Sequence, residues 1–163
     1  GLISSRPNVA PIIGSDRYVS LRIEKYPYLL DLQTMEAFDP FEKCDIDPLA
    51  VTIKGYAPDG KTCLVTFDDV HYLIELATGQ MLPVTELTGL ENVSYVYYVN
   101  QENLAVVDVF EDEYPQEYRA NGYLYNIQNG TRKEKISLEF YCRFCSNCAD
   151  GNRFFQCDKF YLR

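Results

Sequence analysis

Residues 57–80 read APDGKTCLVTFDDVHYLIELATGQ, and this stretch predicts how the whole chain folds. Pro and Asp-Gly stand together at 58–60, a turn signal, because Pro fixes φ, Asp bonds nearby backbone and Gly tolerates positive φ. Runs rich in β-branched, aromatic and aliphatic residues follow at 62–67 and 71–76, and a Thr-Gly pair comes after the second run. Short apolar runs between turn signals predict antiparallel strands.

The second half of this stretch recurs twice elsewhere in the chain. The shared pattern is Tyr-Leu, an apolar residue, one of Asp, Glu or Asn, then Leu or Ile, and it begins at Tyr28, Tyr72 and Tyr123. These tyrosines are 44 and 51 residues apart, and the acidic insertion at 111–117 explains the longer interval. A fixed period of this length indicates one supersecondary unit per repeat.

The turn that opens the stretch also recurs. Its counterparts stand at 15–17, 100–102 and 149–152, each before a further apolar run. Two landmarks that keep a common period of roughly 43 residues indicate repeated structural units. We therefore expect a tail or closing strand at 1–8, followed by repeats with these approximate bounds: 9–43, 44–88, 89–138 and a partial unit at 139–163.

Each repeat is expected to hold four short strands, which in the second repeat are 50–56, 62–67, 71–76 and 80–85. Fourteen Tyr and nine Phe suit half-buried pleated surfaces, so the expected fold class is all-β. A four-stranded antiparallel unit of this length resembles the blade of a β-propeller, and APDGK followed by YLIELATGQ is similar to TolB-like and quinoprotein-like blades. The chain has no Trp, which argues against the Trp-Asp subfamily.

This resemblance implies a fold and says little about activity, because propellers carry many unrelated functions. The three repeat tyrosines are expected to be strand residues that pack between neighbouring blades. Turn chemistry alone accounts for the Asp-Gly pairs, so no catalytic role is expected for them. The length corresponds to three blades and half of a fourth, so we expect a partial propeller rather than a closed ring. Its open ends predict self-association, or pairing with missing blades, through exposed strand edges.

Four of the six cysteines lie near the C-terminus and are the candidate metal ligands: Cys142, Cys145, Cys148 and Cys157. Four thiolates can hold a structural zinc ion, although zinc ribbons use two separated Cys-x-x-Cys pairs. The spacing also differs from iron–sulfur runs. Disulfides, unpaired buried thiols and zinc therefore all remain open, and no other cofactor is indicated. Six cysteines favour an oxidising, extracytoplasmic or secreted compartment.

His71 is the single histidine, and its place after two aspartates predicts a solvated loop residue. Nucleophile-elbow, phosphate-loop and dinucleotide motifs do not occur, so we expect no enzyme active site contained in this chain. The acidic segments 45–47 and 111–117 lack the ligand pattern of a calcium loop and are expected to be solvated. The insertion at the rim of a propeller face would offer a partner-binding surface formed by Tyr114, Pro115 and Tyr118.

The chain carries 15 Lys and Arg against 24 Asp and Glu, a net charge of −9. This balance argues against nucleic acid as a partner, and no apolar run is long enough to span a membrane. The leading hypothesis is a non-catalytic binding or scaffolding module that engages a protein or a glycan. The alternatives are the propeller portion of a larger extracytoplasmic hydrolase or peptidase, and a zinc-stabilised interaction domain.

Overall fold

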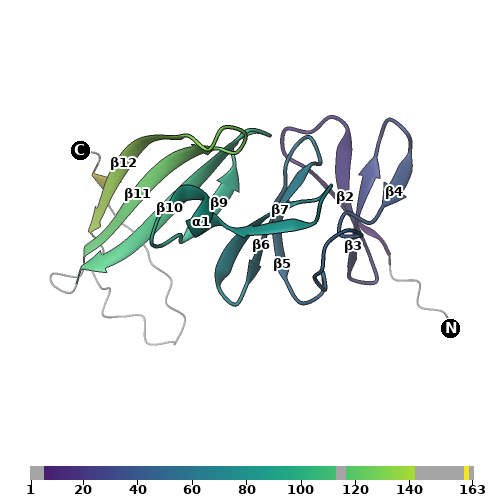
Figure 1. The fold of residues 1–163 in the computed structure, drawn as a ribbon, viewed down its shortest axis with the longest axis horizontal. Coiled ribbons are helices and arrows are strands. Elements are labelled where there is room, and N and C mark those ends of the chain that lie inside the picture. The colour runs from purple at the N-terminus through teal and green to yellow at the C-terminus, as the bar shows by residue number, and fades with distance from the viewer. Residues whose placement is uncertain (1–5, 113–116, 142–159, 162–163) are drawn as a thin grey trace.

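The computed structural model describes residues 6–112, 117–141 and 160–161, and the side chains of residues 6–110 and 119–132. In this part of the chain the strands form three antiparallel sheets, which confirms the predicted all-β class. Figure 1 shows the sheets in a row, with the first at one end and the third at the other. No helix among the described residues is long and apolar enough to cross a membrane.

The first two sheets each contain four strands in chain order. Sheet A consists of β1 (Asn8–Pro11), β2 (Tyr18–Ile23), β3 (Tyr26–Asp31) and β4 (Glu36–Phe38). Sheet B consists of β5 (Thr52–Tyr56), β6 (Thr62–Phe67), β7 (Val70–Glu75) and β8 (Gln80–Pro83). The four strands predicted for the second repeat are therefore found, except that the short helix α1 (Val84–Thr88) replaces the end of the last one.

The third sheet has longer strands and one more of them. Sheet C consists of β9 (Tyr95–Tyr98), β10 (Asn103–Asp112), β11 (Glu117–Asn126), β12 (Arg132–Tyr141) and β13 (Phe160–Tyr161). The first four follow the same order as in the other sheets, and β13 pairs with the outer side of β12.

The three sheets contain the same backbone hydrogen bond at equivalent positions. In each sheet, the residue after the third strand donates its N–H to the carbonyl oxygen of the residue before the second strand: Leu32 to Arg17 (2.7 Å), Leu76 to Lys61 (3.0 Å) and Ile127 to Glu102 (2.7 Å). Three positions further along, each turn holds a residue with positive φ, namely Met35, Gly79 or Gly130. The repeat found in the sequence is therefore a repeat in space.

The strand registers show where the third repeat is longer. In sheets A and B the central hairpin closes with two turn residues, 24–25 and 68–69, after the pairs Ile23–Tyr26 and Phe67–Val70. The equivalent pair in sheet C is Asp108–Asn121, and residues 109–120 stand in place of that turn.

The acidic insertion thus forms the arms of a hairpin, because Glu111 pairs with Tyr118 and Asp112 pairs with Glu117. The expectation that 111–117 is entirely a solvated loop is wrong. Cross-strand hydrogen bonding continues past the point where the other two hairpins turn. The segment 45–47, in contrast, lies between β4 and β5 outside any strand, as expected.

Sheet B is buried on both faces, because alternate residues of a strand point to opposite sides. One core packs Cys63, Val65 and Ile74 of sheet B against Leu29 of sheet A. The other core packs Leu64 and Leu73 of sheet B against sheet C residues that include Leu104, Val106 and Tyr125. Tyr72 packs against the first core, so the expected role of this repeat tyrosine between neighbouring units is confirmed.

At Gly79 the turn after β7 packs closely against the backbone of the loop that connects sheets A and B. The φ of Gly79 is +74°, and a Cβ at this position would overlap the carbonyl oxygen of Lys43. Gly89, which ends α1, has a similar φ of +69°, but a Cβ there would meet no atom within 4 Å. The two glycines therefore share a backbone conformation and differ in their surroundings.

We expect Gly79→Ala to lower the free energy of unfolding by more than Gly89→Ala does. Both changes place an L-residue in the left-handed region, at a cost of about 1–2 kcal/mol. Only Gly79→Ala also forces backbone apart, which adds about 1–3 kcal/mol. Urea unfolding of both variants measures the difference, and equal losses would show that the loop does not pack against Gly79.

Asp108 is the acidic residue at which the third hairpin departs from the other two. Its Oδ1 atom is buried and has no hydrogen-bond partner among the described residues. Burial raises the pKa of this carboxyl, and the nearby Glu91 raises it further. The charged form is therefore less favourable in the folded protein than in the unfolded chain.

Because the pKa of Asp108 is raised on folding, its charge destabilises the fold above that pKa, and the penalty fades as the pH falls below it. We expect Asp108→Asn to raise the melting temperature at pH 7 and to have a smaller effect in acid. The same change at the exposed Asp16 is the control. A gain that does not vary with pH would contradict this account.

Candidate ligand-binding groove

The first strands of the three sheets, β1, β5 and β9, lie next to one another. Each is an edge strand of its sheet, and β5 contacts β9 directly. Together with neighbouring residues they line a cavity of about 390 Å³. A second cavity of about 450 Å³ lies between sheets B and C and shares Lys54, Val96 and Tyr97 with the first. We call these two adjoining cavities, which share three lining residues, the inner groove.

Aromatic side chains form one wall of the inner groove. Tyr95 and Tyr97 are alternate residues of β9, so they point to the same side of the strand. Their ring planes lie within 8° of parallel, with centroids 6.4 Å apart, and both side chains are more than half exposed. Ile13, two residues after β1, adds an aliphatic side chain that is 93% exposed. Exposed Tyr clusters are typical of binding surfaces.

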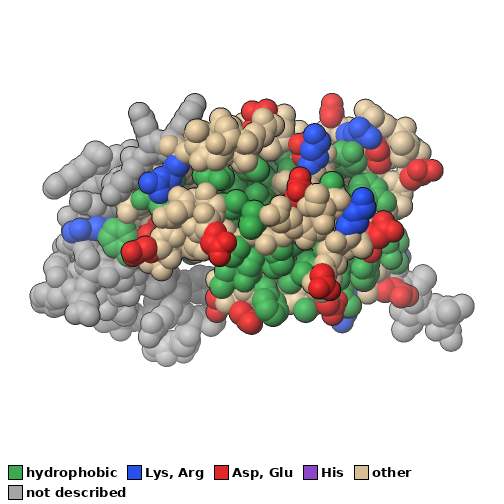
Figure 2. Space-filling view, in the orientation of Figure 1, with side chains coloured by type: hydrophobic (Ala, Val, Ile, Leu, Met, Phe, Trp, Pro, Cys, Tyr) green, Lys and Arg blue, Asp and Glu red, His purple; other side chains and the backbone are tan. Residues whose placement is uncertain are grey.

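The groove is basic although the protein is acidic. Arg22 and Lys54 line it, and neither forms an ion pair with a described residue. Among the described residues, Asp69 is the only carboxylate that lines either cavity. Figure 2 shows acidic side chains spread over the visible surface, around a central hydrophobic region. An anionic group would therefore be attracted to the groove more than to the rest of this surface.

His71 joins sheets B and C. It lies in β7 and is half-buried, and its Nε2–H donates to the carbonyl oxygen of Ser94, 3.0 Å away. The hydroxyl of Ser94 accepts a hydrogen bond from the backbone N–H of Val109 (2.9 Å). The expectation of a solvated loop histidine is therefore wrong, because His71 is a strand residue whose ring is hydrogen-bonded to the residue before β9. These bonds hold β9 against sheet B and thereby position the groove wall.

Two tyrosines at equivalent positions of β5 and β9 differ in their hydrogen bonds. Tyr56 pairs with Cys63, and Tyr98 pairs with Leu104, the equivalent residue of β10. The Tyr98 hydroxyl lies 2.8 Å from the hydroxyl of Thr62 in sheet B. The Tyr56 hydroxyl is buried and has no partner among the described residues. Burial raises the pKa of both phenols, so both remain protonated at neutral pH.

The other predicted site residues lie mainly outside the described part of the chain. This applies to the metal candidates Cys142, Cys145, Cys148 and Cys157, and to the partner-binding candidates Tyr114 and Pro115. Tyr118 is in β11, opposite Glu111, and its side chain is not among those described.

The remaining two cysteines, Cys44 and Cys63, are unpaired thiols in the core between sheets A and B. Burial raises the pKa of the Cys63 thiol, so it is a poor nucleophile. Among the described residues, no three His, Cys, Asp or Glu side chains are grouped to hold a metal ion.

The residues of the inner groove were not among the candidate site residues predicted from the sequence. The alternating tyrosines of 95–98 were a signal of an aromatic strand face, but Arg22 and Lys54 are unremarkable in sequence and come together only in the fold. A scan against models of protein families finds no match, and a search of curated proteins finds none.

We expect Tyr56→Phe and Tyr98→Phe to have opposite effects on stability. The first removes a buried hydroxyl without a partner and should raise the free energy of unfolding by up to about 1 kcal/mol, whereas the second removes a hydrogen bond and should lower it by about 1 kcal/mol. Denaturant unfolding of both variants provides the comparison. A loss of stability in Tyr56→Phe would mean that its hydroxyl is bonded in solution.

Proposed function

We propose that this chain is a non-catalytic binding module built of β-propeller blades, and that it engages an anionic region of a protein or glycan in the inner groove. The observation that carries the proposal is that Arg22 and Lys54, which form no ion pair with a described residue, line one cavity together with the exposed ring of Tyr97 in an acidic protein, and that Tyr95 lines the adjoining cavity with Lys54. Anchoring rings beside charged groups are a common basis of recognition.

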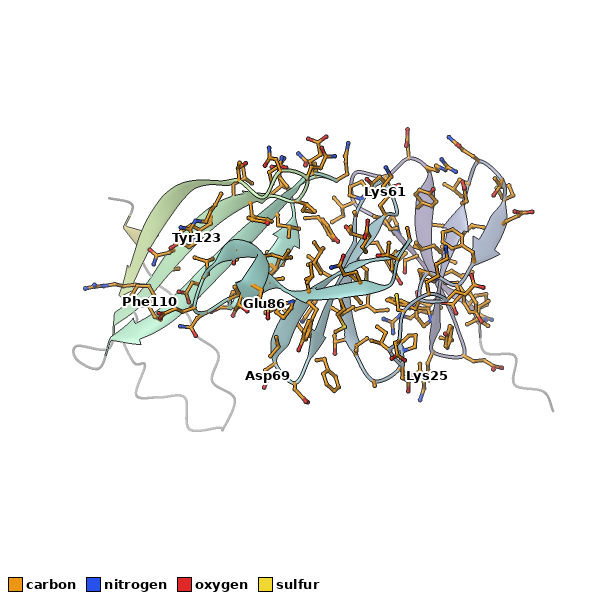
Figure 3. All side chains as sticks on the ribbon, viewed as in Figure 1. Lys25, Lys61, Asp69, Glu86, Phe110 and Tyr123 are labelled. Carbon is orange, nitrogen blue, oxygen red and sulfur yellow. The ribbon has the colours of Figure 1, made fainter. Side chains whose placement is uncertain are left out.

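The blade interpretation is supported by the way the sheets stack. Each of the three units is antiparallel, and each packs a face against the next, with the first strands turned toward a shared groove. Propeller blades are four-stranded sheets arranged around a central channel. In Figure 3 the turns that carry Lys25 and Asp69 lie on the lower side of the row of sheets, and Lys61 lies on the upper side, as expected for units of one orientation.

Binding rather than catalysis is supported by the hydrogen bonds that the polar groups near the groove already form within the protein. His71 is bonded to a backbone carbonyl, and the Ser94 hydroxyl is bonded to backbone, so these two residues hold strands together. The groups left available, Arg22 and Lys54, supply charge and hydrogen-bond donors. Such donors pair with carboxylates, sulfates or phosphates.

The test uses two probes, a heparin-type sulfated glycan and a poly-glutamate peptide, titrated by isothermal calorimetry. We expect one of them to bind the protein, and the double variant Arg22→Ala/Lys54→Ala to weaken that binding at least about tenfold, because a charge-assisted hydrogen bond contributes roughly 1.5–3 kcal/mol. Tyr97→Ala should also weaken it.

The matched control is Lys25→Ala/Lys61→Ala, which removes the same charge from exposed positions away from the groove. The control should change affinity less than about threefold at 150 mM salt, where distant charges are screened. Failure of both probes to bind, or equal weakening by the control, would overturn the proposal that this groove takes anionic partners.

A further inference from the structure

Each sheet has two kinds of face, and the strand registers place equivalent residues on them. We define the head face by the positions that carry Val19, Leu21 and Leu30 in sheet A, and their equivalents Cys63, Val65 and Ile74 in sheet B. In sheet C the same positions carry Leu104, Val106 and Tyr125. The tail face is the opposite side, with Leu29 in sheet A, Leu73 in sheet B and Leu124 in sheet C.

The two contacts between sheets within the chain follow one rule. The tail face of sheet A packs on the head face of sheet B, and the tail face of sheet B packs on the head face of sheet C. Equivalent residues therefore form both interfaces. The same type of interface therefore occurs twice in one chain. A third interface of this type would need one more uncovered head face and one more uncovered tail face.

The head face of sheet A is apolar and uncovered by the described residues. Leu21 and Leu30 are half-buried there, whereas their equivalents in sheets B and C are at most 5% exposed. Val9 of β1 is 57% exposed, and its equivalent Val96 in β9 is 5% exposed. Figure 1 shows sheet A at one end of the row, with no described element beyond it.

The tail face of sheet C is the matching surface at the other end of the row of described sheets. Leu124 is half-buried, while its equivalents Leu29 and Leu73 are 0% and 7% exposed. Ala105 and Val107 lie on the same face and are half-buried as well. Tyr95 and Tyr97 of the edge strand β9 lie where this face meets the inner groove. Both tyrosines are more than half exposed. Contiguous apolar faces of this kind mark interaction sites.

We propose that the head face of sheet A is covered by the tail face of sheet C from a second copy of this chain. The basis is continuity: the chain already forms this type of interface between sheets A and B and again between sheets B and C. In this proposed contact the two copies associate through sheet faces, whereas the sequence led us to expect association through strand edges. A head-to-tail contact is heterologous, so it either closes into a ring, whose smallest form is a dimer, or extends into larger assemblies.

The test is the oligomeric state measured by analytical ultracentrifugation, together with two single variants. Leu21→Glu places a charge on the head face, and Leu124→Glu places one on the tail face. We expect the unmodified protein to associate with increasing concentration and each variant alone to be monomeric, since a buried unpaired charge opposes the contact. Leu49→Glu, at a 58% exposed leucine outside both faces, is the control and should associate normally.

Mixing the two monomeric variants distinguishes head-to-tail from other contacts. Each variant keeps one intact face, so the mixture should form a 1:1 heterodimer through a single interface and no larger species. If Leu124→Glu fails to fold by circular dichroism, Val107→Glu replaces it, because Val107 is a half-buried residue of the same face that lies outside the groove. A protein that remains monomeric at 100 µM, or variants that stay monomeric when mixed, would overturn the proposal.

Discussion

The burial of sheet B on both faces is the constraint on which the rest of the structure depends. Successive residues of β6 point alternately to the two sides, and Cys63, Leu64 and Val65 are all within 3% of complete burial. A strand that is apolar at consecutive positions is stable only if something covers both faces. Sheets A and C supply that cover, and this fixes the order of the row. The groove and the uncovered end faces are consequences of the same stacking.

The shared turn bond keeps the stacked units alike. Each sheet uses a hydrogen bond between the residue after the third strand and the residue before the second, although the side chains there differ: Asp31 forms an ion pair with Arg17, while Glu75 bonds Thr78 and Asn126 bonds backbone N–H groups of its own turn. Backbone geometry, not one conserved side-chain contact, therefore defines the repeat. Because the backbone path is the same, equivalent residues fall on equivalent faces, and the same type of interface forms twice.

Most of the fold could be predicted from local patterns, and most of the groove could not. The strands of sheet B, the turn residues at 59–60 and the repeat tyrosines follow from alternation and turn chemistry, which act over a few residues. The extended hairpin of β10 and β11 could not be predicted, because its acidic residues resemble those of a loop when the cross-strand pairing is unknown. The role of His71 could not be predicted for a similar reason, since its partner Ser94 is 23 residues away in the sequence.

The sequence by itself determined the all-β class, the period of the units and the apolar positions of each strand. The tertiary structure decided which of those positions are covered and which charges come together. Leu21, Val65 and Val106 occupy one position of the repeat and are all aliphatic, yet only the last two are buried, because burial depends on what lies beyond the sheet. Likewise Arg22 and Lys54 share a cavity only because the first strands of separate units converge.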